Sequence, residues 1–78
     1  MQKQTEHTDE RVAEIAKKIK ELRIASGYKS AENFAFDHEI NRVQYWRVEN
    51  GANITLKTLL KILDIHKLSL AEFFNSLS

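Results

Sequence analysis

Apolar residues recur along this chain at three- and four-residue steps, which is the spacing of one face of an α-helix. The first run of this kind is Val12, Ile15, Ala16, Ile19 and Leu22. It predicts an amphipathic helix that Thr8 or Asp9 caps and that ends near Gly27. Proline is absent from the chain, so long uninterrupted helices are permitted.

A second, shorter run follows Ser30, which is a favourable N-cap residue. Its members are Ala31, Phe34, Ala35 and His38. His38 takes the last inward position, and we expect a half-buried histidine there because no partner stands at metal-ligand spacing. Only Glu39 and Ile40 separate this helix from Asn41. The next helix must therefore begin across a sharp turn, at the spacing of a helix-turn-helix.

Residues 41–51, NRVQYWRVENG, predict a short third helix with local signals at both ends. Asn41 suits the N-cap, and Gln44 stands where a capping-box partner would reach back. Gly51 suits the left-handed residue beyond the helix end. A short helix is therefore predicted between Asn41 and Gly51.

This third helix is predicted to have two distinct faces. Tyr45 and Val48 lie three positions apart and form the face that packs on the rest of the protein. The side chains that point elsewhere are Arg42, Val43, Gln44, Trp46 and Arg47. We take this second set, the outer face, as the candidate functional surface.

Two more helices complete the prediction. Thr55 suits the N-cap of a fourth helix, and Ser69 to Glu72 form a capping box for a fifth. The apolar positions of the fourth helix are Leu56, Leu59, Leu60, Ile62, Leu63 and Ile65. Those of the fifth are Leu70, Phe73, Phe74 and Leu77. The expected fold class is all-α, with residues 1–8 as a flexible tail and 9–78 as a single domain.

Composition excludes several classes of function. The 78 residues include no cysteine, which rules out disulfides and thiolate sites and agrees with a cytoplasmic location. No apolar run approaches the roughly 18 residues of a membrane span, and the polar start does not match a signal peptide. The sequence contains no glycine-rich phosphate cradle and no nucleophile–base arrangement. We therefore expect no enzymatic activity, cofactor, metal or small-molecule ligand.

The net charge of +1 is too small for a non-specific nucleic-acid binder. If DNA is the partner, positive charge must be concentrated on one face. The basic residues of the first helix are interpreted as a solvated surface.

The order of these five helices resembles the lambda-repressor-like (Cro/XRE) helix-turn-helix family. The resemblance covers about residues 12–74 and depends on the joint order of several strings. These are KELR at 20–23, FA at 34–35, NRVQYWRVENG at 41–51, TLLKI at 58–62 and LSLAEFF at 68–74. It implies a compact five-helix domain that binds double-stranded DNA as a transcriptional regulator, by expectation a repressor.

By position, the resemblance implies that residues 42–49 form the recognition helix in the major groove. Arg42, Val43 and Arg47 match positions that reach base edges, and Gln44 matches one that reaches a base or a phosphate. Arginine can bond guanine O6 and N7, and valine can pack on a thymine methyl group. The residues expected to approach the sugar-phosphate backbone are Lys29, Ser30, Asn50, Asn53 and Lys57.

The resemblance also implies an ion pair between Arg23, at the end of the first helix, and Glu49, near the end of the third. Such a buried pair locks the two helices together, although desolvation can cancel its net stability. With Tyr45 and Val48, both residues are interpreted as structural.

Four residues depart from the family pattern. Ala31 stands where the family usually has a glutamine that meets a phosphate, and Glu39 replaces the glycine of the turn. A residue other than glycine at positive φ carries a cost, so either the turn differs or the strain is present. Tyr45 and Trp46 replace small residues. We expect the Tyr45 hydroxyl at the edge of the core, and Trp46 either packed on a helix or partner or lying on DNA.

A small DNA-binding module buries limited surface, so we expect a homodimer on a roughly palindromic site. Leu77 and the exposed parts of the last helix are candidates for its interface, although closure of the core also explains them. The alternative function is a protein-interaction or antitoxin-like module on the same fold. Its anchors would be Trp46, Tyr45 and Phe74.

Overall fold

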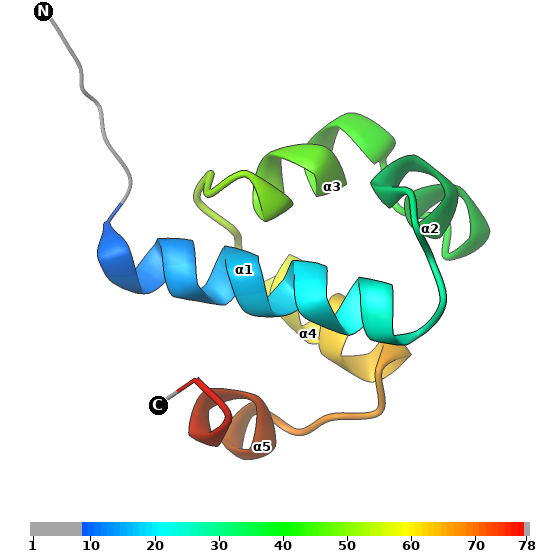
Figure 1. Cartoon of the computed structure of the whole chain (residues 1–78). Coiled ribbons are helices and arrows are strands. Elements are labelled where there is room, and N and C mark those ends of the chain that lie inside the picture. Colours follow the sequence, from blue (N-terminus) through cyan, green and yellow to red (C-terminus); the bar gives the residue numbers. More distant parts are fainter. Residues whose placement is uncertain (1–8, 78) are drawn as a thin grey trace, which may run out of the picture.

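The computed structural model describes residues 9–77, which form five helices and no strand. The elements in chain order are α1 (Glu10–Ala25), α2 (Ala31–Asp37), α3 (Arg42–Glu49), α4 (Leu56–Ile65) and α5 (Leu70–Asn75). In Figure 1 the long helix α1 crosses the middle of the molecule, with α2 and α3 on one side and α5 on the other. The all-α prediction is confirmed, whereas the predicted flexible tail, residues 1–8, lies outside the described residues.

All five helices begin at the residues that the sequence predicts. At each start the side chain of the N-cap residue accepts a hydrogen bond from a backbone N–H in the first turn, which satisfies a donor that the helix itself leaves free. These residues are Asp9, Ser30, Asn41, Thr55 and Ser69. Ser69 and Glu72 form the complete capping box. At Asn41 only one of the two capping-box bonds forms. The Gln44 N–H donates to the Asn41 side chain, but within residues 9–77 the Gln44 side chain does not bond the Asn41 backbone N–H.

The first four helices end in the same way. The residue beyond each end has a positive φ: 98° at Gly27, 58° at Glu39, 91° at Gly51 and 58° at Lys67. Its N–H donates to the carbonyl three residues earlier, and the next N–H donates to the carbonyl five residues earlier. This is the Schellman arrangement, which satisfies the last carbonyls of a helix.

Two of these four turns lack the glycine that suits a positive φ. Glu39 therefore adopts a conformation that favours glycine, so the strain expected from the sequence is present. Inside the turn the N–H of Ile40 donates to Ala35 O at 2.8 Å, and Ile40 itself is buried. From α4, Lys61 Nζ donates to the carbonyl oxygen of Glu39 at 3.0 Å. Together with the bond from the Glu39 N–H to Phe36 O, packing and three hydrogen bonds hold the α2–α3 turn in its strained form.

The core is centred on Phe34 of α2, which is fully buried. Its ring lies 5.1 Å from that of Tyr45, 5.2 Å from Tyr28 and 5.4 Å from His66, measured between centroids. His38 packs beside it and is half-buried, as predicted. The buried cluster draws on the helices and the α2–α3 turn: Ile19, Phe34, Ala35, Ile40, Tyr45, Val48, Leu59, Ile62, Leu63 and Phe73.

Four residues predicted as inward positions of the last two helices are exposed instead. They are Leu56, Leu60, Leu70 and Phe74. The remaining predicted positions of α4 and α5 are buried or half-buried, and Leu77 packs against the core. Each of these helices therefore buries a narrower stripe than its apolar pattern suggests.

Candidate nucleic-acid interface

Helix α3 is held at both ends by its own sequence. Asn41 Oδ1 accepts from the Gln44 N–H at 2.9 Å at the start of the helix. At the other end, Asn50 Nδ2 donates to the Trp46 carbonyl oxygen at 2.8 Å, and Gly51 begins the return of the chain. Because both ends are satisfied locally, the eight residues between them form a short helix with a defined orientation.

The two predicted faces of α3 are separate in the structure. Tyr45 is fully buried and Val48 nearly so, whereas the five residues of the outer face are all exposed. Val43 and Trp46 expose 57% and 58% of their surface, so two apolar side chains lie between the arginines at positions 42 and 47. This combination offers hydrogen-bond donors and apolar contact on one exposed surface.

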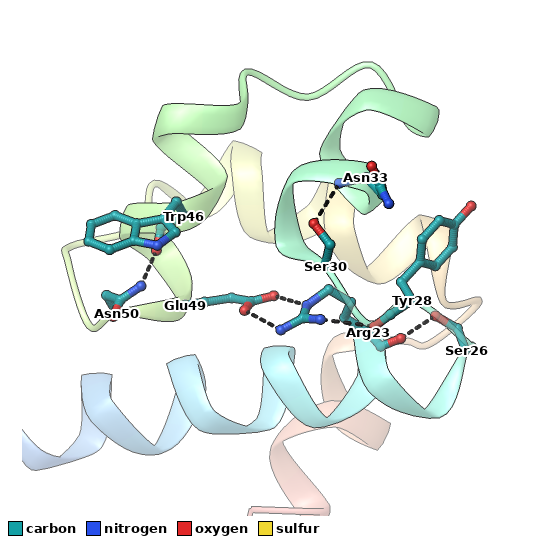
Figure 2. A network of polar contacts seen from close by, with 8 residues as sticks. All are labelled: Arg23, Ser26, Tyr28, Ser30, Asn33, Trp46, Glu49 and Asn50. Carbon is teal, nitrogen blue, oxygen red and sulfur yellow. Dashed lines mark hydrogen bonds and ion pairs between the residues drawn. The ribbon is translucent and has the colours of Figure 1, made fainter.

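The predicted pair between Arg23 and Glu49 is present and fastens α3 to α1 (Figure 2). Arg23 Nε lies 2.7 Å from Glu49 Oε2, and Nη2 lies 3.0 Å from Oε1. A third nitrogen, Nη1, donates to the carbonyl oxygen of Tyr28 at 2.9 Å. Only 5% of each charged side chain is exposed, so the pair is buried.

The hydrogen bonds of this pair keep Arg23 charged. Hydrogen bonding to Glu49 raises the pKa of the Arg23 guanidinium, although burial acts in the opposite direction. Arg23 therefore stays positive at every working pH. The result is a charged, two-bond link between α1 and α3, with the loop before α2 attached to the same arginine.

Tyr45 lies beside this pair, and its hydroxyl is not at the edge of the core as predicted. The oxygen is buried and has no hydrogen-bond partner among the described residues. Burial is the main reason that the pKa of Tyr45 is raised, and the nearby Glu49 carboxylate adds to it. The prediction was wrong because the ring packs against Phe34 and its polar end lies beside the buried Arg23–Glu49 pair, so the whole side chain is buried.

A groove of about 480 Å³ runs along α3 on the side of the α3–α4 loop. It brings Gln44 and Arg47 of α3 together with Asn53 of the loop. The other lining residues include the buried Val48 and the half-buried Ile54, which form an apolar floor. Val43 of α3 also lines the groove, so three of the predicted base-contacting residues and one predicted backbone-contacting residue share one surface.

The other predicted backbone contacts are distributed around α3. Lys29 is exposed in the loop before α2, and Ser30 is half-buried because its hydroxyl caps that helix. Asn50 lies in a hollow with Trp46 and Arg47 at the end of α3. Lys57 is exposed in the first turn of α4.

Trp46 is the residue whose role the sequence left open. In Figure 2 its ring lies on the outside of α3, whereas Glu49 points toward Arg23. More than half of its surface is exposed, so it is not packed into a neighbouring helix. It instead forms one wall of a hollow of about 200 Å³, which Glu32, Arg42 and Val43 also line.

One residue of this surface was missed by the sequence analysis. Glu32, in the first turn of α2, accepts a hydrogen bond from Arg42 Nη1 at 2.9 Å. The two residues are ten positions apart and belong to different helices, so no local spacing rule signals their contact. Glu32 thus places a negative charge beside the first arginine of the outer face.

No group of three or more metal-ligating side chains lies together within residues 9–77. Over the same residues, no helix is both long and apolar enough to span a membrane. Comparison with protein-family models, curated proteins and solved structures found no match to this chain. What can be said of its function therefore depends on the site described above.

Proposed function

We propose that this protein is a lambda-repressor-like helix-turn-helix protein of the cytoplasm that binds double-stranded DNA sequence-specifically as a transcriptional regulator, by expectation a repressor. The observation that carries the proposal is the outer face of α3. Arg42 and Arg47 are exposed there beside Val43 and Gln44, on a helix with both ends capped. The buried ion pair between Glu49 and Arg23 of α1 holds the opposite side of this helix against the rest of the protein.

In this proposal α3 enters the major groove and α2 crosses the backbone. Base readout comes from Arg42, Val43, Gln44 and Arg47. Contacts to the sugar-phosphate backbone come from Lys29, Ser30, Asn50, Asn53 and Lys57, which surround α3 and fix its register. Arg47 shares a groove with Gln44 and Asn53, so it combines base readout with a neighbouring phosphate contact.

We further propose that the protein binds DNA as a homodimer. A single module of this size buries too little surface for tight operator binding, and two copies on half-sites one helical turn apart, about 34 to 36 Å, double the contact. Leu70 and Phe74 stand four residues apart on α5 and are both exposed, which makes α5 the candidate contact surface.

Selection from a pool of random duplexes at low salt tests the proposal. The wild type is expected to enrich one roughly palindromic sequence. Arg47→Ala should change the preferred base at one position of each half-site, with a loss of roughly 1–3 kcal/mol on the original site. Lys29→Ala should instead weaken all duplexes alike and reduce the slope of log affinity against log salt by about 0.9.

The matched control is Lys18→Ala on α1, which removes the same charge beside the C-terminal residues Ser76 and Leu77. Its sequence preference should equal that of the wild type. Failure of the wild type to enrich any sequence would contradict the proposal. The exposed Trp46 and Val43 would then favour the second candidate function, a protein-interaction or antitoxin-like module that uses this apolar surface.

A further inference from the structure

The ion pair between Glu32 and Arg42 needs an explanation other than stability. Both side chains are well exposed, 65% and 69% respectively, and pairs of this kind contribute little to the free energy of folding. The pair also joins two helices that already pack together through the buried Phe34 and Tyr45. Its position is more informative than its strength, because it lies on the exposed rim of the outer face of α3.

The pair leaves most of its hydrogen-bonding capacity unused. A guanidinium group carries five N–H donors, and the bond to Glu32 uses one of them. The carboxylate accepts that bond through Oε2, and Oε1 has no partner among residues 9–77. Side by side, the pair therefore offers two or more donors from Arg42 and one acceptor from Glu32.

A single base pair has the complementary pattern in the major groove. Guanine shows the acceptors N7 and O6, and the paired cytosine shows its N4 amino donor next to that O6. An adenine–thymine pair instead places the adenine amino donor against the arginine and the thymine O4 acceptor against the carboxylate. A reversed cytosine–guanine pair exchanges donor and acceptor in the same way.

We propose that Glu32 and Arg42 read one G·C base pair as a unit, with Arg42 on guanine N7 and O6 and Glu32 accepting from cytosine N4. This inference rests on the proposed function and adds a specificity-determining residue from α2 to it. Glu32 acts in two ways: its bond holds the Arg42 side chain over the groove, and its charge rejects base pairs that present an acceptor. Rejection of wrong partners by an unpaired charge is a general source of specificity.

The hollow beside the pair supports this arrangement. Val43 and Trp46 form its apolar walls, and Glu32 and Arg42 form its polar rim. A base edge that docks against these apolar walls would present its hydrogen-bonding groups to the polar rim. The carboxylate also repels the phosphate backbone, so Glu32 should lower affinity for DNA in general while raising discrimination at one position.

The experiment uses the site that the wild type selects and three proteins: wild type, Glu32→Ala and the control Glu21→Ala. Glu21 lies beside Leu77 on another face, and its replacement changes the net charge by the same amount. We expect Glu32→Ala to bind duplexes without the selected G·C pair more tightly than the wild type does, because the carboxylate no longer repels the backbone. Its preference for G·C over other pairs should fall about tenfold at one position per half-site, while Glu21→Ala should keep the wild-type preference. Equal thermal midpoints would show that Glu32→Ala does not act through stability.

A modified base tests the cytosine contact directly. Pyrimidin-2-one in place of that cytosine lacks the N4 amino group and leaves guanine N7 and O6 in place. Relative to the unmodified duplex, the affinity of the wild type for this duplex should fall about tenfold more than the affinity of Glu32→Ala does. If the wild type selects a site but both proteins respond alike to the modified base, Glu32 has no role in readout. If the wild type selects no site, the proposed function fails, and this inference fails with it.

Discussion

Removing one partner of the Arg23–Glu49 pair is the sharpest test of how α3 is held. The substitution Glu49→Gln keeps the size of the side chain but removes its charge. Arg23 then remains buried with only 5% of its side chain exposed and without a counter-ion. Breaking a buried pair from one side costs about 3–5 kcal/mol, and because the amide oxygen still accepts one hydrogen bond, we expect a loss of about 3 kcal/mol.

This loss converts to a large change in thermal midpoint because the protein is small. An unfolding entropy of about 2.1 cal/mol/K per residue gives roughly 0.16 kcal/mol/K for 78 residues. A loss of 3 kcal/mol should therefore lower the midpoint by about 18 °C. Circular dichroism during heating, together with urea unfolding at 25 °C, measures both quantities.

The double variant Arg23→Met with Glu49→Leu is the matched comparison. It removes both buried charges at once, so its stability should lie well above that of Glu49→Gln and near that of the wild type. The arginine also donates to the Tyr28 carbonyl oxygen, and the loss of that bond should cost the double variant about 1 kcal/mol. An unchanged midpoint in Glu49→Gln would refute a buried ion pair, as would a double variant less stable than Glu49→Gln.

Three further substitutions test the packing around Phe34 and the turns at Glu39 and Lys67. Burial lowers the pKa of His66 below its usual 6.5, and the charge of His38 makes a smaller contribution in the same direction. Folding therefore favours the neutral form of His66. The stability of the wild type should decline as the pH falls below about 6.5. His66→Phe, which keeps the stacking on Phe34, should remove part of that decline in urea unfolding at pH 7.5 and 5.5; an equal decline would assign it to other groups. Glu39→Gly should raise the thermal midpoint by about 3–6 °C, because relief of the backbone strain at a φ of 58° outweighs the added entropy of the unfolded chain. Lys67→Gly, at the same φ, should raise the midpoint by a similar amount. A lower midpoint for Glu39→Gly alone would show that its side chain supports the turn.

The ends of the helices were predictable because they are decided locally. An N-cap side chain and its backbone donor are only two or three residues apart, so Ser30, Asn41 and Ser69 act without help from distant parts of the chain. The positive φ at Gly51 follows from the same local logic. Lys67 was not foreseen as a residue of positive φ, because nothing in its own chemistry favours that conformation and the turn is held instead by two backbone hydrogen bonds.

The width of a buried stripe is not a local property. Leu56 and Leu60 continue the apolar pattern of α4, and Leu70 and Phe74 that of α5, yet all four are exposed. Periodicity shows which side of a helix is apolar, but how much of that side is covered depends on the angle and length of its neighbours. α5 has only six residues, so it can cover little of the adjacent surface.

The two ion pairs at the candidate interface also differ in how far they could be predicted from the sequence. The Arg23–Glu49 pair was expected because the resemblance links those two positions, and its burial follows from their places at the ends of α1 and α3. The Glu32–Arg42 pair depends on how the first turn of α2 meets the first turn of α3, which only the folded α2–α3 turn determines. The buried pair thus sets the orientation of α3, and the exposed pair then sets the direction of its first arginine. In the proposed DNA complex, a change in the turn at Glu39 should therefore alter base readout by Arg42 more than base readout by Arg47, which lies in the groove near the other end of the helix.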